Sequence, residues 1–262
     1  MIFETHAHYE DKKFDTDRAQ LLNSMPELGI GPVVNVGSTI ETTKQSIQLA
    51  ESYEFVYAAA GVHPSEIGEL DDSSMDWLKR QAAHPKVVAI GEIGLDYYWE
   101  KDEEVRKQQR HWFKEQLAVA KETGLPVIIH SRDAAKDTLS IMKDAFTDQI
   151  RGVIHCFSYS EEIALEYVRM GYFIGVGGVV TFKNAKKLKE TVRKIPLESI
   201  LLETDCPYMA PEPYRGKRNS SAYLPLVVKE IARIKDIPEQ EVIETTSRNA
   251  YRMYDKILNE KG

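Results

Sequence analysis

Short apolar runs alternate with longer amphipathic stretches from one end of the chain to the other, and this alternation limits the possible folds more than any other feature. Eight apolar runs are nearly continuous, as in "VVNVG" and "ILLET", which is typical of strands buried on both faces. We expect strands at residues 2–6, 33–37, 55–62, 87–92, 126–130, 152–157, 172–177 and 200–205. Amphipathic segments predict helices at residues 15–28, 42–52, 74–83, 103–123, 134–145, 161–170, 184–194, 222–235 and 239–258.

Eight strands, each followed by a helix, are the count of an α/β protein of the (β/α)8 TIM-barrel type. A doubly wound open sheet would share the alternation, but the first strand-to-helix turn, "THAHYED", lacks the glycine-rich phosphate loop of a dinucleotide-binding fold. The 262 residues suit one barrel, and we expect a single domain over residues 1–262. In such a barrel the active site lies at the C-terminal ends of the strands.

The charge balance limits the kinds of molecule that the chain is expected to bind. The chain has 34 basic and 41 acidic residues and a net charge of −7, which argues against a protein that coats nucleic acid through its overall charge. Two cysteines are consistent with a reducing compartment. We find no apolar run long enough to span a membrane and no signal peptide. We therefore expect a soluble cytoplasmic protein with no membrane association and no obligate protein partner.

Residues that can bind metals stand at the ends of the expected strands. They are His6, His8, Glu92, His130, His155 and Asp205. Because the strand ends of a barrel converge on one face, these six side chains are expected to meet there. Residues i and i+2 of a strand point to the same side, so the two histidines of "THAH" can reach one point. The competing interpretation is a set of histidines satisfied by hydrogen bonds, which clustering at one pole disfavours.

The number of candidate ligands favours two metal ions. A catalytic zinc usually has three protein ligands and an open position, whereas this set offers four imidazoles and two carboxylates. We expect His6, His8 and Asp205 at one divalent ion, His130 and His155 at the other, and Glu92 as the bridge. Such a pair acidifies a water molecule and clamps a phosphate, and Asp205 would accept the proton of that water. The ligand set suits Zn, Mn, Fe or Mg without selecting among them.

Basic and aromatic residues follow several of the strands on the same face. Arg215, Lys217 and Arg218 in "YRGKRNSS", with Arg132 in "HSRDA" and Lys183 in "TFKNA", are candidates for holding phosphates, with a solvated loop as the alternative. His63 in "GVHPSE" is a candidate for substrate binding or for supporting a ligand. Residues 97–99, "YYW", would either stack on bases or pack against the neighbouring loop.

Several long blocks in the same order resemble one family. They are "THAH", "GVHP", "GEIGLDYYW", "HSRDA", "HCFS", "GVGGVVTFKNA", "LLETDCPYMAP" and "RGKRN", and they resemble the TatD family of metal-dependent deoxyribonucleases in the amidohydrolase-like barrel superfamily. The resemblance implies a (β/α)8 barrel, divalent-metal phosphodiesterase activity on DNA, and the same six ligands. The chain departs from the family pattern at Glu4, Tyr159, Cys206 and residues 219–221, "NSS". None of these departures removes a ligand, and those at Tyr159 and residues 219–221 bear on substrate preference.

Three functions are compatible with these observations. The first is a two-metal deoxyribonuclease, expected to be of the 3′–5′ exonuclease type, with DNA as its substrate. The second keeps the metals but acts on an amide, lactone or aminoacyl ester. The third is a nucleic-acid-binding or scaffold protein with a vestigial site, which six intact ligands disfavour.

Overall fold

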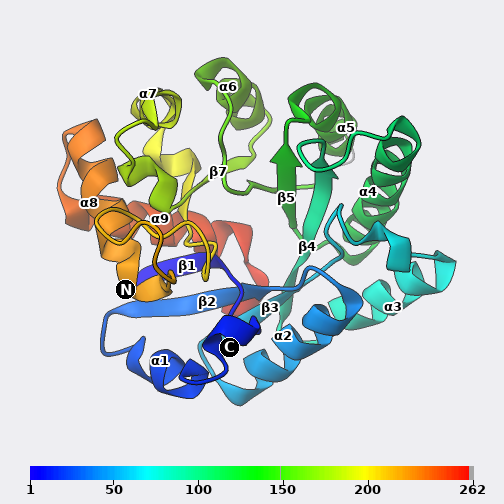
Figure 1. The fold of residues 1–262 in the computed structure, drawn as a ribbon, viewed down its shortest axis with the longest axis horizontal. Coiled ribbons are helices and arrows are strands. Elements are labelled where there is room, and N and C mark those ends of the chain that lie inside the picture. The colour runs from blue at the N-terminus through cyan, green and yellow to red at the C-terminus, as the bar shows by residue number, and fades with distance from the viewer. Residues whose placement is uncertain (148, 260–262) are drawn as a thin grey trace.

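The eight strands form one parallel sheet that curls into a nearly closed barrel. A computed structural model describes residues 1–147 and 149–259, and in it neighbouring strands pair in chain order from first to last. The strands are β1 (Ile2–Ala7), β2 (Ile30–Val36), β3 (Val56–Ala60), β4 (Val87–Asp96), β5 (Val127–Arg132), β6 (Gly152–Ile154), β7 (Phe173–Val176) and β8 (Ile200–Leu202). Figure 1 shows the strands at the centre with helices around them. The predicted (β/α)8 barrel is confirmed.

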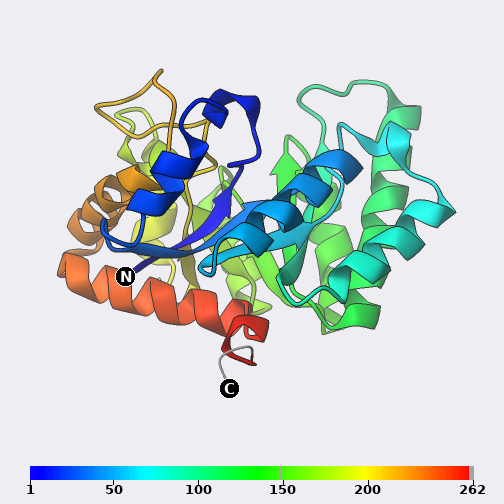
Figure 2. The same ribbon diagram turned by 90° about the horizontal axis from the view of Figure 1, so that it is seen from below.

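The helices shield the outer surface of the barrel and one of its ends. They are α1 (Arg18–Ser24), α2 (Ile40–Ser52), α3 (Asp72–Ala82), α4 (Glu103–Thr123), α5 (Ala135–Thr147), α6 (Glu161–Arg169), α7 (Lys186–Lys194), α8 (Leu224–Lys235), α9 (Glu239–Met253) and α10 (Lys256–Asn259). In Figure 2, α9 runs beneath the barrel. None of the described helices combines the length and apolar character needed to cross a bilayer.

Two apolar layers hold the barrel together. The outer layer lies between strands and helices, and the inner one takes at least one buried residue from every strand, such as Phe3, Ile128 and Leu201. Met253 and Tyr254 from the end of α9 belong to the inner layer, and the Tyr254 hydroxyl donates to the Thr5 carbonyl. The N-terminal end of the barrel is thus filled with apolar side chains, which leaves the C-terminal end for polar chemistry.

The barrel closes where β1 meets the segment after β8. The Asp205 N–H donates to the His6 carbonyl at 3.0 Å, and the His8 N–H donates to the Cys206 carbonyl at 2.8 Å. The Thr5 hydroxyl adds a bond to the Leu202 carbonyl. Because these bonds use the backbone of expected metal ligands, barrel closure and the position of those ligands are set together.

Several strand ends differ from the expected ones. Strand β4 continues four residues past Glu92, because its ladder with β5 resumes after a register shift and runs to the pair Asp96–Arg132. Strands β6 and β8 stop at Ile154 and Leu202, earlier than expected. The prediction that His155 and Asp205 end strands is therefore wrong. The ladders stop because Cys156 and Asp205 have φ values of 45° and 55°, which extended strands do not allow.

Two helices are shorter, by more than two residues, than the amphipathic pattern indicated. The helix expected over residues 15–28 is limited to α1, and a 3-10 turn at Lys12–Phe14 precedes it. The helix expected over residues 239–258 ends at Met253, because Tyr254 leaves the helical conformation (φ −98°, ψ 53°) before α10 begins. Helix α4 has the expected bounds.

Candidate metal centre

All six expected metal ligands meet at the C-terminal end of the barrel. Glu92 lies at their centre, and its two carboxylate oxygens face different groups of imidazoles. Its Oε1 is 2.7 Å from His130 Nδ1 and 3.6 Å from His155 Nε2. Its Oε2 is 3.5 Å from His6 Nε2 and 3.9 Å from His8 Nε2. This is the arrangement that a bridging carboxylate requires.

The two histidines of "THAH" aim their Nε2 atoms at one point. These atoms are 3.0 Å apart, and Asp205 Oδ1 lies 3.8 Å from His6 Nε2 and 3.5 Å from His8 Nε2. A 3.0 Å spacing is compatible with two ligands that each lie about 2.0–2.1 Å from one ion. The three side chains form one of the described clusters able to hold a metal.

A second cluster contains His130 and a residue that was expected to touch substrate. His63, Glu92 and His130 form this cluster, with His63 Nε2 3.9 Å from Glu92 Oε1. The Ser65 N–H donates to His63 Nδ1 at 3.2 Å, so in a neutral ring the proton is on Nε2, which faces the centre. Burial and the neighbouring His130 lower the pKa of His63 to about 4, so the ring is neutral near pH 7.

Two acidic residues that sequence reasoning missed contact the ring nitrogens of His155 and His130 that do not face Glu92. Glu203 Oε2 is 3.2 Å from His155 Nδ1, and Asp96 Oδ2 is 3.1 Å from His130 Nε2. Metal-ligating histidines commonly have such carboxylate partners, which fix the ring orientation. The even spacing of Asp96 from Glu92 along one strand was the signal that could have pointed to it. Glu203 stands two residues before Asp205 in the expected strand, so the same even spacing could have pointed to it.

The donor set fits divalent cations. His130 lies between the carboxylates of Glu92 and Asp96. A neutral imidazole has a proton on only one nitrogen, so the lone pair of its other nitrogen would point at a carboxylate and be repelled by it. A second proton on the ring, or a cation bound at that nitrogen, removes this repulsion. In addition, His6 Nδ1 is buried and has no hydrogen-bond partner among the described residues. Imidazole nitrogen and carboxylate oxygen are the ligands that Zn and similar ions take. The polar groups of this centre are therefore arranged for cations.

The electrostatics keep the carboxylates ionised. Burial raises the pKa of Glu92, but His155, His130 and His6 outweigh it and hold that pKa well below the usual range. Burial lowers the pKa of His155, yet the charges of Glu203 and Glu92 raise it to about 9. The pKa of His6 is lowered by burial and by His155. Protons thus occupy part of this centre when no metal is bound, and metal binding must release them.

Glu4, a departure from the family pattern, is part of a buried hydrogen-bond network. Its Oε1 accepts from the N–H groups of His6 and Thr204, and its Oε2 accepts from the hydroxyls of Thr204 and Ser221 at 2.7 and 2.8 Å. Ser221 Oγ also accepts from the Tyr9 hydroxyl. Burial raises the pKa of Glu4 to about 7, against the effect of these bonds. The long acid at position 4 and the serine at position 221 are therefore two halves of one network.

The other departures also have structural roles. The Tyr159 hydroxyl is 2.9 Å from Ser131 Oγ and accepts from the Ala134 N–H, so it ties its loop to the segment that follows β5. Cys206 is fully buried. Cys156 is partly buried, beside His155 and Asp205, and its N–H donates to Glu203 Oε1.

The three basic residues after β8 have different surroundings. The Arg218 guanidinium already has partners within the protein, because it donates hydrogen bonds to the Asp17 carboxylate and to the Lys13 carbonyl. Arg215 is exposed and stacks on the Phe182 ring at 4.4 Å. Lys217 is exposed, and no described residue pairs with its side chain. Arg132 lies at the end of β5 and stacks on Tyr98.

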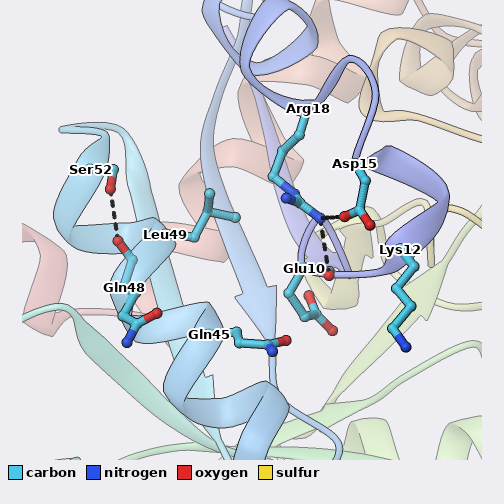
Figure 3. Close-up of a pocket in the computed structure, with 8 residues that line it drawn as sticks. All are labelled: Glu10, Lys12, Asp15, Arg18, Gln45, Gln48, Leu49 and Ser52. Atoms are coloured by element: carbon cyan, nitrogen blue, oxygen red, sulfur yellow. Dashed lines mark hydrogen bonds and ion pairs between the residues drawn. The ribbon is translucent and has the colours of Figure 1, made fainter.

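A separate pocket lies behind the first ligand pair. Its volume is about 450 Å3, and Figure 3 shows it between the 3-10 turn after β1 and helix α2, with Glu10 and Arg18 on one side and Gln45 on the other. The Glu10 carboxylate is 3.4 Å from His8 Nδ1 and accepts from Asn35 at 2.6 Å. Glu10 thus faces His8 from the wall of this pocket, whereas the hydrogen bond of His8 Nδ1 is to the Val36 carbonyl at 2.8 Å.

Comparisons with known proteins agree with this geometry. Residues 3–255 match the family described as TatD related DNase. An uncharacterized metal-dependent hydrolase of Bacillus subtilis, YabD, is 41% identical over 97% of this chain and 99% of its own length. The uncharacterized metal-dependent hydrolase TatD of Mycobacterium tuberculosis is 34% identical, with 97% of each chain covered. The crystal structure of YjjV, a TatD homologue of Escherichia coli, has a TM-score of 0.90 at 32% identity and covers 97% of this chain and 98% of that one.

Proposed function

This chain belongs to the TatD related DNase family and is a metal-dependent hydrolase, and from this premise we propose that it hydrolyses phosphodiester bonds of DNA. The observation that carries the proposal is the Glu92 carboxylate, whose two oxygens face two separate groups of imidazoles. A centre for two cations suits in-line displacement at phosphorus, where both the attacking and the leaving oxygen need stabilisation.

The proposal assigns the six ligands to two divalent ions. His6, His8 and Asp205 would hold one ion, His130 and His155 would hold the other, and the Glu92 carboxylate would lie between the two groups. When bound, these ions supply Lewis-acid stabilisation of the phosphate and acidify water at neutral pH. Glu203, Asp96 and the Val36 carbonyl keep the rings of His155, His130 and His8 oriented.

Asp205 is proposed as the general base. Burial raises the pKa of its carboxyl, but the hydrogen bond with His8 and the charges of the nearby histidines hold that pKa below its usual value. The carboxylate is therefore ready to take the proton from the attacking water. His63, with its Nε2 proton facing the centre, is proposed to donate a hydrogen bond to a phosphate oxygen. Arg215 and Lys217 are proposed to hold phosphates farther along the strand.

The test is cleavage of end-labelled DNA by the purified protein. Single- and double-stranded oligonucleotides labelled at the 5′ or the 3′ end are incubated with Mg, Mn or Zn, and in parallel with a chelator. We expect metal-dependent cleavage, and a 5′-labelled strand that shortens one nucleotide at a time identifies the proposed 3′–5′ exonuclease action. Absence of cleavage with every metal, together with hydrolysis of an amide or lactone, would overturn the proposal in favour of that chemistry.

A matched pair of variants tests whether the Asp205 carboxylate is required for turnover. Asp205→Asn is expected to lower turnover about 100-fold or more, because general-base catalysis contributes about 10²–10⁴-fold. Asp236→Asn is the control, since Asp236 is exposed at the C-terminal end of α8 in a left-handed conformation that asparagine also adopts. If the Asp205→Asn protein keeps most of its activity, Asp205 is not the base.

A further inference from the structure

The three aromatic residues after β4 divide into one buried and two exposed side chains. Tyr97 is 8% exposed, bonds to Asp137 at 2.8 Å and stacks with Arg106. Tyr98 and Trp99 are 43% and 71% exposed. The "YYW" run therefore packs through its first member only, and leaves an adjacent pair of rings in solvent beside the mouth of the barrel.

Arg132 completes a cluster with the two exposed rings. Its guanidinium carbon is 4.0 Å from the centre of the Tyr98 ring and 5.6 Å from that of Trp99. The two rings meet edge to face, with centroids 4.7 Å apart. No described residue accepts a hydrogen bond from the Arg132 side chain, so its N–H groups are available while one of its faces is stacked. An exposed indole and an unpaired guanidinium lie next to each other.

One buried carboxylate fixes this cluster relative to the metal centre. Asp96 Oδ1 accepts from the N–H groups of Tyr98 and Trp99 at 2.9 and 3.1 Å, and its Oδ2 is 3.1 Å from His130 Nε2. Arg132 follows His130 by two residues on the same strand, so both side chains point to the same side. The cluster is thus built onto the ligand side of the centre rather than onto an independent loop.

The geometry points to a nucleotide subsite in which Trp99 stacks on a base next to the cleaved bond and Arg132 binds the phosphate of that nucleotide. This inference rests on the proposed function. A nucleotide combines a flat π-surface with an anion, and the cluster offers the two complementary groups side by side. Tyr98 acts as a positioning residue, because its ring holds the guanidinium in place. The subsite therefore determines how the strand is aligned in the centre.

The experiment measures binding without catalysis. The full-length protein in chelator is titrated into a labelled single-stranded DNA heptamer, and affinity follows from fluorescence anisotropy. Seven further heptamers each lack one base and keep the phosphate. Trp99→Ala is expected to weaken binding of the intact heptamer about 5- to 160-fold, the range found for losing one base–aromatic stack. One of the base-less heptamers should bind the parent protein equally weakly and should not be weakened further by Trp99→Ala.

An Arg132 variant tests the phosphate contact, and tryptophan fluorescence tests the stacking of Trp99. Arg132→Gln should weaken every heptamer, base-less ones included, because it removes a phosphate contact. In a protein with Trp77→Phe and Trp112→Phe, all tryptophan emission comes from Trp99, and the intact heptamer should quench it more than the base-less one. Unchanged emission would overturn the stacking role.

The control is an exposed aromatic residue on another part of the barrel. Phe146 is 48% exposed near the end of α5, and Phe146→Ala is expected to leave heptamer affinity unchanged. Equal affinities of the Trp99→Ala and Phe146→Ala proteins overturn the subsite and leave the proposed DNase function standing. Failure of the parent protein to bind or cleave any DNA overturns both.

Discussion

Removing the Ser221 hydroxyl is expected to destabilise the protein by about 2.5–4 kcal/mol. Ser221 Oγ is fully buried, donates to Glu4 Oε2 and accepts from the Tyr9 hydroxyl, each at 2.8 Å. A hydrogen bond to a charged group contributes about 1.5–3 kcal/mol, and a buried hydroxyl left without its acceptor costs about 1–3 kcal/mol. Because Glu4 keeps three other donors, from Thr204 and His6, we take the lower part of the combined range.

The measurement is urea unfolding of the Ser221→Ala protein at pH 8 in chelator. At this pH most of the Glu4 carboxyl is ionised, since its pKa is about 7. The matched control is Ser220→Ala at the neighbouring position, where the side chain is also buried but no described residue bonds to its hydroxyl. The control should lower the free energy of unfolding by much less than Ser221→Ala does, because it removes no hydrogen bond to a described residue. Equal effects of the two substitutions would refute the energetic role of the network.

Three further outcomes are expected. Asp96→Asn should weaken metal affinity about 10–100-fold in competition with a chromophoric chelator, and unchanged affinity would exclude a role in orienting the histidine ligand. Neutralising Arg215 or Lys217 should reduce the slope of log affinity for single-stranded DNA against log salt by about 0.7 each, whereas identical slopes would place this loop off the DNA path. Glu230 has a pKa of about 2, against an ordinary value of 4.5, mainly because of its hydrogen bond with Arg233. The contribution of ionised Glu230 to the free energy of unfolding is therefore complete above about pH 4.5 and is lost as the pH falls toward 2. Glu230→Gln should destabilise the protein more at pH 6 than at pH 3. An equal effect at the two pH values would contradict the lowered pKa.

The barrel was predictable because periodicity and order along the chain are sufficient to count its units. The ends of the strands were not, since they depend on where neighbouring backbones stay in register. Strand β4 runs on to Asp96 only because β5 offers it a partner there, and β8 ends at Leu202 because Asp205 turns the chain with a positive φ. Neither effect changes the hydrophobic periodicity of the sequence, so neither strand end could be predicted from it.

The meeting of the six candidate ligands followed from one geometric rule, that strand ends of a barrel converge. Their supporting partners did not follow from it, because those contacts join residues far apart in the chain. Glu4 finds its partner at Ser221, and Glu203 finds His155, through the packing of different strands and loops. The pairing of Arg218 with Asp17 joins the first and the last loop of the face, so local sequence showed its charge but not that it was already bound.

The backbone hydrogen bonds between β1 and the segment after β8 also determine when the barrel can close during synthesis on the ribosome. His6 and His8 are synthesised before their backbone partners, Asp205 and Cys206, which follow about 200 positions later. A nascent chain that has not yet reached this segment carries five of the six candidate ligands without the bonds that join them. Any cation held by ligands from both segments then favours the completed barrel by mass action. An unfinished chain therefore lacks both the Asp205 side chain and the backbone bonds that place His6 and His8 beside it.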